Sequence, residues 1–199
     1  MKLALILTLM GLAVYFCAVL FVIPSEYSNV KTLEPEPIFT AKLSSNQIRL
    51  GDSFNITIDS DNSNDSADIQ IVSVAFPSIT QIGNTVKIVG YNFTQSPRYV
   101  KTGDDIGYEY SGGTALIKAQ YPSIEAYSRP VNPGAHYSIE MKITPDSAGN
   151  FTVFAKTVAI PHSGDHSHYP YGGIRDHQNE YVESFSVMVS DNLDKPGMG

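Results

Sequence analysis

The chain has 199 residues, a formal net charge of −7 and a single cysteine. Because it is acidic and has no cluster of lysine or arginine, it repels phosphate backbones, and we expect no nucleic acid partner. The cysteine, Cys17, lies in an N-terminal apolar segment, so the remainder has no disulfide and no thiol for catalysis. About 160 residues follow that segment and its linker, enough for one domain with its own core.

Residues 3–23, LALILTLMGLAVYFCAVLFVI, form a run of 21 residues without a charge. As an α-helix, this run would extend about 30 Å, the thickness of the hydrocarbon core of a bilayer. We therefore interpret residues 1–23 as an uncleaved transmembrane anchor, with a cleaved secretion signal as the alternative. Lys2 precedes the run and acidic residues follow it, which predicts a single-pass protein of the cell membrane with a cytoplasmic N-terminus and an extracytoplasmic C-terminal domain.

Residues 24–37 are rich in proline and glutamate and are expected to form a stalk. An exported domain over residues 38–190 and a flexible tail over residues 191–199 follow. The domain contains runs with β-strand composition or period-two alternation, separated by Gly, Pro, Asn and Asp. These runs predict an all-β, antiparallel immunoglobulin-like sandwich of seven to eight strands, at residues 38–44, 54–59, 68–76, 86–93, 114–121, 137–144, 151–160 and 181–190.

The segment PDSAGNFTVFA, residues 145–155, supplies a more specific signal. It resembles the turn into the sixth strand of immunoglobulin-like domains, where an acidic residue, small residues and an aromatic residue are closely spaced. Here these positions are Asp146, Ala148, Gly149 and Phe151. The two cysteines and the core tryptophan of antibody domains are missing, so the resemblance implies a fold class and no function.

A longer segment, GAHYSIEMKITPDSAGNFTVFAKTVAI, invites a second comparison. Its spacing is similar to that of the last hairpin of the exported cupredoxin-like domain in the B subunit of copper membrane monooxygenases. That family carries a His-x-His pair on the second strand, and the pair would fall here on Thr152 and Phe154. Neither residue can replace an imidazole at copper, so the resemblance implies an exported sandwich without the family's copper ligands.

Histidines gather in a loop between the last two predicted strands, residues 161–177. Two of them are two residues apart, so on an extended backbone both rings lie on one side. Imidazole with carboxylate suits Cu(II) or Zn(II), whereas a blue-copper centre is excluded because it requires a thiolate. The alternative is a solvated loop whose histidines titrate near neutral pH. The candidate metal ligands are His162, His166, His168, His177, Asp165 and Asp176.

Two further features concern the surface of the domain. Four Asn-x-Ser/Thr triplets make Asn55, Asn64, Asn92 and Asn150 candidates for glycosylation. Tyrosines are frequent between residues 91 and 137, where they could form a recognition surface or cover the ends of the core.

The chain has no Gly-rich phosphate loop, no G-x-S-x-G motif and no H-E-x-x-H motif, and we expect no enzymatic activity. The leading hypothesis is a membrane-anchored extracytoplasmic β-sandwich that acts as an interaction, structural or accessory-subunit module, with a protein partner in or at the membrane. The alternative is an extracytoplasmic copper or zinc binding protein that uses the His-rich loop.

Overall fold

The computed structural model describes residues 2–22, 32–106, 117–162, 165–176 and 179–191. The chain divides into two compact units, Met1–Thr32 and Leu33–Gly199. Of the predicted tail, only residue 191 lies within the described residues.

The first unit contains one helical segment. An α-helix, α1, runs over Lys2–Cys17, and a short π-helix follows over Ala18–Val22. The prediction of a continuous α-helix over residues 3–23 is therefore wrong, because the α-helix ends at Cys17. Its 16 residues extend about 24 Å instead of about 30 Å. Across the described residues, the structure contains no helix with both the length and the apolar character that crossing a membrane requires.

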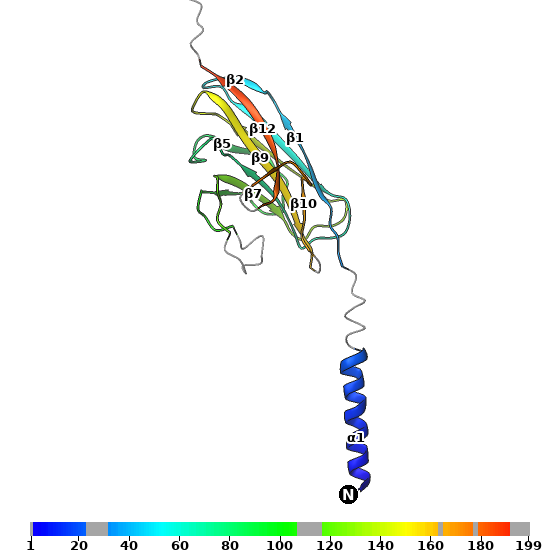
Figure 1. Ribbon diagram of the computed structural model, residues 1–199. Coiled ribbons are helices and arrows are strands. Elements are labelled where there is room, and N and C mark those ends of the chain that lie inside the picture. The colour runs from blue at the N-terminus through cyan, green and yellow to red at the C-terminus, as the bar shows by residue number, and fades with distance from the viewer. Residues whose placement is uncertain (1, 23–31, 107–116, 163–164, 177–178, 192–199) are drawn as a thin grey trace, which may run out of the picture. The chain divides into compact units, whose positions relative to one another are not determined.

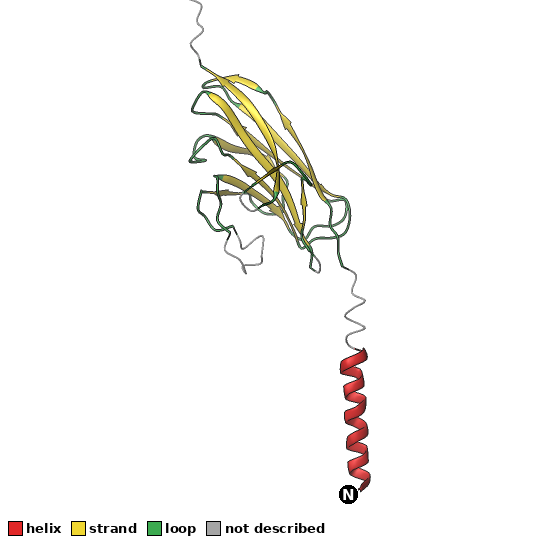
Figure 2. Ribbon diagram, viewed as in Figure 1, coloured by secondary structure: helices red, strands yellow, loops and turns green. Residues whose placement is uncertain are grey.

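The second unit is a two-sheet β-sandwich, and its described residues are strands and loops (Figure 2). The first sheet has the order β1 (Pro37–Leu43), β3 (Phe54–Asn62), β8 (His136–Ile143) and β5 (Val86–Tyr91). The second has the order β11 (Ile174–Arg175), β12 (Tyr181–Ser190), β9 (Gly149–Ile160), β4 (Ile69–Ala75), β7 (Ser123–Ser128) and β6 (Arg98–Val100). Two short strands complete it (Figure 1), since β10 (Ser167–Tyr169) pairs with β9 and β2 (Gln47–Arg49) pairs with β12.

The predicted sandwich is confirmed at the level of two packed sheets, but the described residues form twelve strands instead of seven to eight, and three further details differ. Strand β2 runs parallel to β12, so the pairing is not wholly antiparallel. The predicted strand at 114–121 is wrong in its described part, which forms only an isolated bridge between Lys118 and Asp105. Strand β7 was not predicted, because Pro122 and Pro130 on either side gave its sequence the character of a loop.

The main core lies between the two sheets. Strand β3 alternates strictly, so that Phe54, Ile56 and Ile58 are buried while the residues between them are half-buried. Strands β4 and β9 behave differently, because long stretches of each are buried on both faces. The outer face of the second sheet, opposite the main core, is therefore also buried under other parts of the chain. The site described below lies on this face.

Residues 33–36, at the end of the predicted stalk, are bound to the sandwich. The backbone N–H of Glu36 donates to Oδ1 of Asn62 at 3.0 Å, and Nδ2 of Asn62 donates to the carbonyl oxygen of Asp65 at 2.8 Å. The exposed Asn64 donates to the carbonyl oxygen of Glu34 at 2.9 Å. Asn62 is completely buried, so it fixes the entry of the chain into β1 from the inside.

We expect Asn62→Ala to lower the free energy of unfolding by about 1–3 kcal/mol, because it removes two hydrogen bonds from a completely buried side chain and leaves the partly buried N–H of Glu36 and carbonyl oxygen of Asp65 without these partners. Urea denaturation of the folded chain measures this change, and amide hydrogen exchange at Glu36 should become faster. Asn64→Ala is the matched control at an exposed asparagine, and its effect should be smaller. Equal effects of the two substitutions would contradict the role assigned to Asn62.

Candidate functional site

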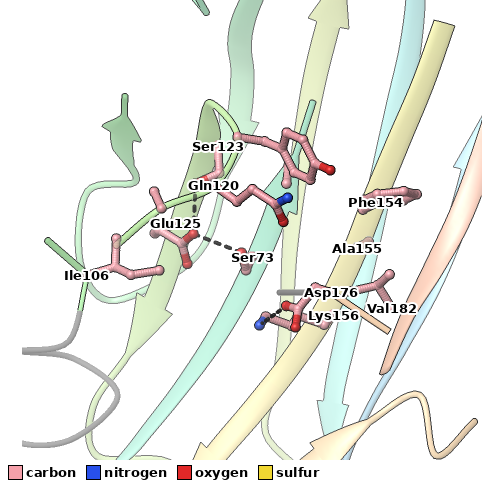
Figure 3. A pocket seen from close by; sticks show the side chains of 13 residues that line it. Ser73, Ile106, Gln120, Ser123, Glu125, Phe154, Ala155, Lys156, Asp176 and Val182 are labelled. Carbon is pink, nitrogen blue, oxygen red and sulfur yellow. Dashed lines mark hydrogen bonds and ion pairs between the residues drawn. The ribbon is translucent and has the colours of Figure 1, made fainter. Parts of the chain in front are cut away.

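A small cavity of about 40 Å³ lies against the outer face of the second sheet. Figure 3 shows charged side chains of two separate clusters at this cavity, one around Glu125 of β7 and the other around Lys156 of β9. The cavity is also lined by the buried apolar side chains of Ile106, Ala119 and Val182. Charged groups in such surroundings are costly unless they are paired and hydrogen-bonded.

The Lys156 cluster consists of one ammonium group and two carboxylates. Nζ of Lys156 lies 2.6 Å from Oδ2 of Asp176 and 2.5 Å from Oε2 of Glu180. The exposed fractions of the three side chains are 6%, 10% and 19%. This is a buried ion-pair network rather than a surface salt bridge, so water screens it only weakly.

Local structure explains how the three residues meet. Lys156 follows Ala155 of the main core, so the period of two along β9 places it on the opposite, outer face. Asp176 directly follows β11 and Glu180 directly precedes β12. The N–H of Asp176 donates to the carbonyl oxygen of Glu180 at 2.8 Å, and the N–H of Glu180 donates to Oδ1 of Asp176 at 3.1 Å, so one tight connection presents both carboxylates to the lysine.

The network sets the protonation state of the lysine. Burial lowers the pKa of the Lys156 ammonium group, whereas the negative charges of Glu180 and Asp176 and their hydrogen bonds raise it. The net result is a pKa above the ordinary value of 10.5, so the amine is protonated at neutral pH. The cluster then carries one positive and two negative charges when both carboxyl groups are ionised.

Glu125 forms the second cluster. Its side chain is buried, and its Oε1 accepts hydrogen bonds from Oγ of Ser73 at 2.8 Å and from Oγ of Ser123 at 2.9 Å (Figure 3). Both serines lie on the same outer face, one on β4 and one at the start of β7. Their hydroxyl groups supply hydrogen bonds that the buried carboxylate would otherwise take from water.

The structure places the predicted histidine ligands with different partners. Nδ1 of His162 lies 3.2 Å from Oδ2 of Asp68, and both side chains are largely exposed. Nε2 of His166 lies 3.8 Å from Oε1 of Glu180. The ring of His168 stacks against that of Tyr181, with 6.4 Å between the ring centroids.

The predicted carboxylate ligands do not complete a metal shell either. Asp165 is exposed, and Asp176 is engaged by Lys156. His177 lies outside the described residues. Within the described ranges, no group of three or more His, Cys, Asp or Glu side chains is arranged to hold a metal ion. Metal binding by residues 161–177 therefore stays a prediction.

The candidate glycosylation sites differ in accessibility. Asn64, Asn92 and Asn150 are exposed, whereas Asn55 is half-buried and its Nδ2 donates to Oε1 of Glu140 at 2.8 Å. Among the tyrosines that we considered for recognition, Tyr91 and Tyr99 are largely exposed, with exposed fractions of 47% and 45%.

No family model and no curated protein matches the chain. Among solved structures, the chain is similar to the CARDB domain of the PF1109 protein from Pyrococcus furiosus, with 10% identity, a TM-score of 0.40, and 81% of this chain and 98% of that chain covered. It is also similar to the collagen-binding domain of a Staphylococcus aureus adhesin, with 12% identity, a TM-score of 0.37, and 75% and 96% covered. A third similarity is to a putative membrane anchored protein from Corynebacterium diphtheriae, with 14% identity, a TM-score of 0.41, and 82% and 38% covered.

These similarities amount to a distant structural resemblance to bacterial immunoglobulin-like, CARDB and adhesin β-sandwich domains, and no sequence family is identified. The resemblance to the exported domain of copper membrane monooxygenases stays a prediction.

Proposed function

We propose that the second unit is an extracytoplasmic interaction module that binds a protein partner at the cell envelope. The observation that carries this proposal is a set of exposed side chains on two edge strands, Val89 and Tyr91 on β5 and Tyr99 on β6. Their exposed fractions are 57%, 47% and 45%. We name these three residues the edge patch.

Hydrogen bonds hold the edge patch in place. The hydroxyl group of Tyr99 accepts the backbone N–H of Ile88 at 3.2 Å, which connects β6 of one sheet to β5 of the other. The hydroxyl groups of Tyr91 and Ser96 lie 3.3 Å apart. Aromatic rings that are already ordered lose little conformational entropy on binding, so they make effective contacts with a partner.

The same geometry favours recognition by side chains over addition of a partner strand. Strand β5 has a register shift between Ile88 and Gly90, and such bulges interrupt the regular ladder that an added strand needs. Tyr99 also occupies one backbone donor of β5. We therefore propose that the partner contacts the aromatic rings of the edge patch.

The alternative function, copper or zinc binding by the His-rich loop, has less support. His162, His166 and Asp176 are each engaged with a different charged group. A metal would have to displace those contacts, including the buried ion pair between Lys156 and Asp176.

The test is purification of the full chain from its native envelope after in-cell cross-linking. We expect one stoichiometric protein partner with the wild type and a loss of about tenfold or more with Tyr91→Ser/Tyr99→Ser, because rigid aromatic anchors contribute about 1.4 kcal/mol or more to such contacts. Tyr171→Ser is the matched control, since Tyr171 is also exposed, at 64%, and lies outside the edge patch. If the double variant retains the partner as the wild type does, the edge patch is not the binding surface.

A further inference from the structure

We propose that Lys156 and Asp176 join through an intramolecular amide bond between Nζ and the side-chain carboxyl group, promoted by Glu180. The three groups are in direct contact, with Nζ at 2.6 Å from Oδ2 of Asp176 and 2.5 Å from Oε2 of Glu180. An amine and a carboxyl group held in this way react as one molecule, and the effective concentration of such pairs is very high. This inference is independent of the edge patch.

Glu180 is positioned to move the protons. Its Oε2 contacts Nζ, so it can take a proton from the ammonium group and release the lone pair that attacks Cγ of Asp176. The same carboxyl group can then pass protons to the departing oxygen, Oδ2, which also contacts Nζ. The ring of His166 lies 3.8 Å from the other oxygen of Glu180 and is about half exposed, so solvent reaches the margin of the cluster at this histidine.

Asp176, rather than Glu180, is the group that is attacked. Its Oδ1 accepts the backbone N–H of Glu180 at 3.1 Å, and this donor would stabilise the negative charge that develops on Oδ1 when Nζ adds to Cγ. Asp176 is also the more buried of the two carboxylates, with an exposed fraction of 10% against 19%. Nζ must be the neutral amine when it attacks, and burial of Lys156 favours the neutral amine over the ammonium group.

The reaction is balanced without any further reagent. The ammonium group and the carboxylate become an amide and one water: the bond between Nζ and Cγ forms, the bond between Cγ and Oδ2 breaks, and the two protons lost from nitrogen leave with the oxygen. Nothing is oxidised or reduced, and Glu180 begins and ends as a carboxylate. The adjacent cavity of about 40 Å³ has room for the released water.

The raised pKa of Lys156 makes the reaction slow, because the neutral amine is a minor form at neutral pH. A slow step is sufficient, since it occurs once in the life of each chain. The product ties β9 covalently to the connection between β11 and β12. A link of this kind stiffens the cover over the outer face of the second sheet.

Mass spectrometry of the purified, folded full chain tests the proposal. We expect a tryptic product in which the peptide beginning at Asp176, after cleavage at Arg175, is attached to a peptide that remains uncut at Lys156. A linear peptide left uncut at Arg175 and Lys156 would have the same mass as this product, so the mass of the intact chain is measured as well and should be one water below the mass of its sequence. Wild-type protein in which trypsin cleaves at Lys156, and in which the two peptides are separate, would overturn the proposal.

Three variants distinguish formation of the amide bond from a close ion pair without a covalent bond. Lys156→Arg and Glu180→Gln should abolish the linked product, the first for lack of the nucleophile and the second for lack of the proton acceptor. Asp176→Asn should give a linked product lower in mass by one ammonia instead of one water, because its leaving group is nitrogen. Circular dichroism shows whether each variant is folded, and a linked product that persists in folded Glu180→Gln would remove Glu180 from the mechanism.

Discussion

Lys156→Met lowers the free energy of unfolding by about 3–5 kcal/mol, the usual cost of removing one partner from a buried ion pair. The substitution keeps a long apolar side chain in β9 and removes the charge that compensates Asp176 and Glu180. Both carboxylates are at least four-fifths buried, so water does not replace the lost ammonium group. Urea denaturation at neutral pH measures the change, with an unchanged dependence on denaturant as the sign of an intact fold.

Lys142→Met is the matched control, because Lys142 is an exposed lysine on strand β8 and its loss should change the free energy by less than about 0.5 kcal/mol. In chains where the proposed amide has formed, it replaces the ion pair between Lys156 and Asp176, so the wild type is not the reference for the ion pair alone. A comparison of Glu180→Gln with Lys156→Met/Glu180→Gln isolates the ion pair with Asp176, since neither protein can form the bond. Equal stability of Lys156→Met and Lys142→Met would show that the network does not stabilise the fold.

The strands that could be predicted from the sequence are those in which apolar and polar residues alternate. In β3 the apolar residues Phe54, Ile56 and Ile58 alternate with polar ones, because one face meets the core and the other is partly solvated. Strand β7 also has a period of two, but its outer face carries Ser123 and Glu125, which are buried under the cover and look like solvent-facing residues in the sequence. Burial on both faces removed the distinction on which the prediction depended.

Short strands escaped prediction for another reason. Strands β2, β10 and β11 have three, three and two residues, and each exists because a longer strand lies beside it. The partner of β2 is β12, which is far away in the sequence, whereas β11 pairs with β12 as the next strand along the chain. A segment of two or three residues is too short to show the alternation of apolar and polar residues from which a strand is predicted.

The candidate site shows the same limit at the level of chemistry. The sequence identified His166, His168 and Asp176 as candidate ligands in one loop, and the structure places Asp176 in a charged cluster and His166 at its margin. The sequence analysis did not identify Lys156 as the central residue of the cluster. Lys156 lies in the otherwise uncharged segment FTVFAKTVAI. A single charge in a doubly buried strand is the signal that could have found it, because such a charge requires a partner.

Phe54→Ala tests the main core and should lower the free energy of unfolding by about 3–5 kcal/mol, through lost burial and the cavity left behind. Phe54 is 1% exposed on β3, and its ring meets that of Phe151 on β9 edge to face, with 5.8 Å between centroids. It therefore connects the two sheets. Urea denaturation measures the loss, and Val89→Ala, at an exposed position, should change stability little. Similar denaturation midpoints for both variants would mean that the sheets do not pack through Phe54.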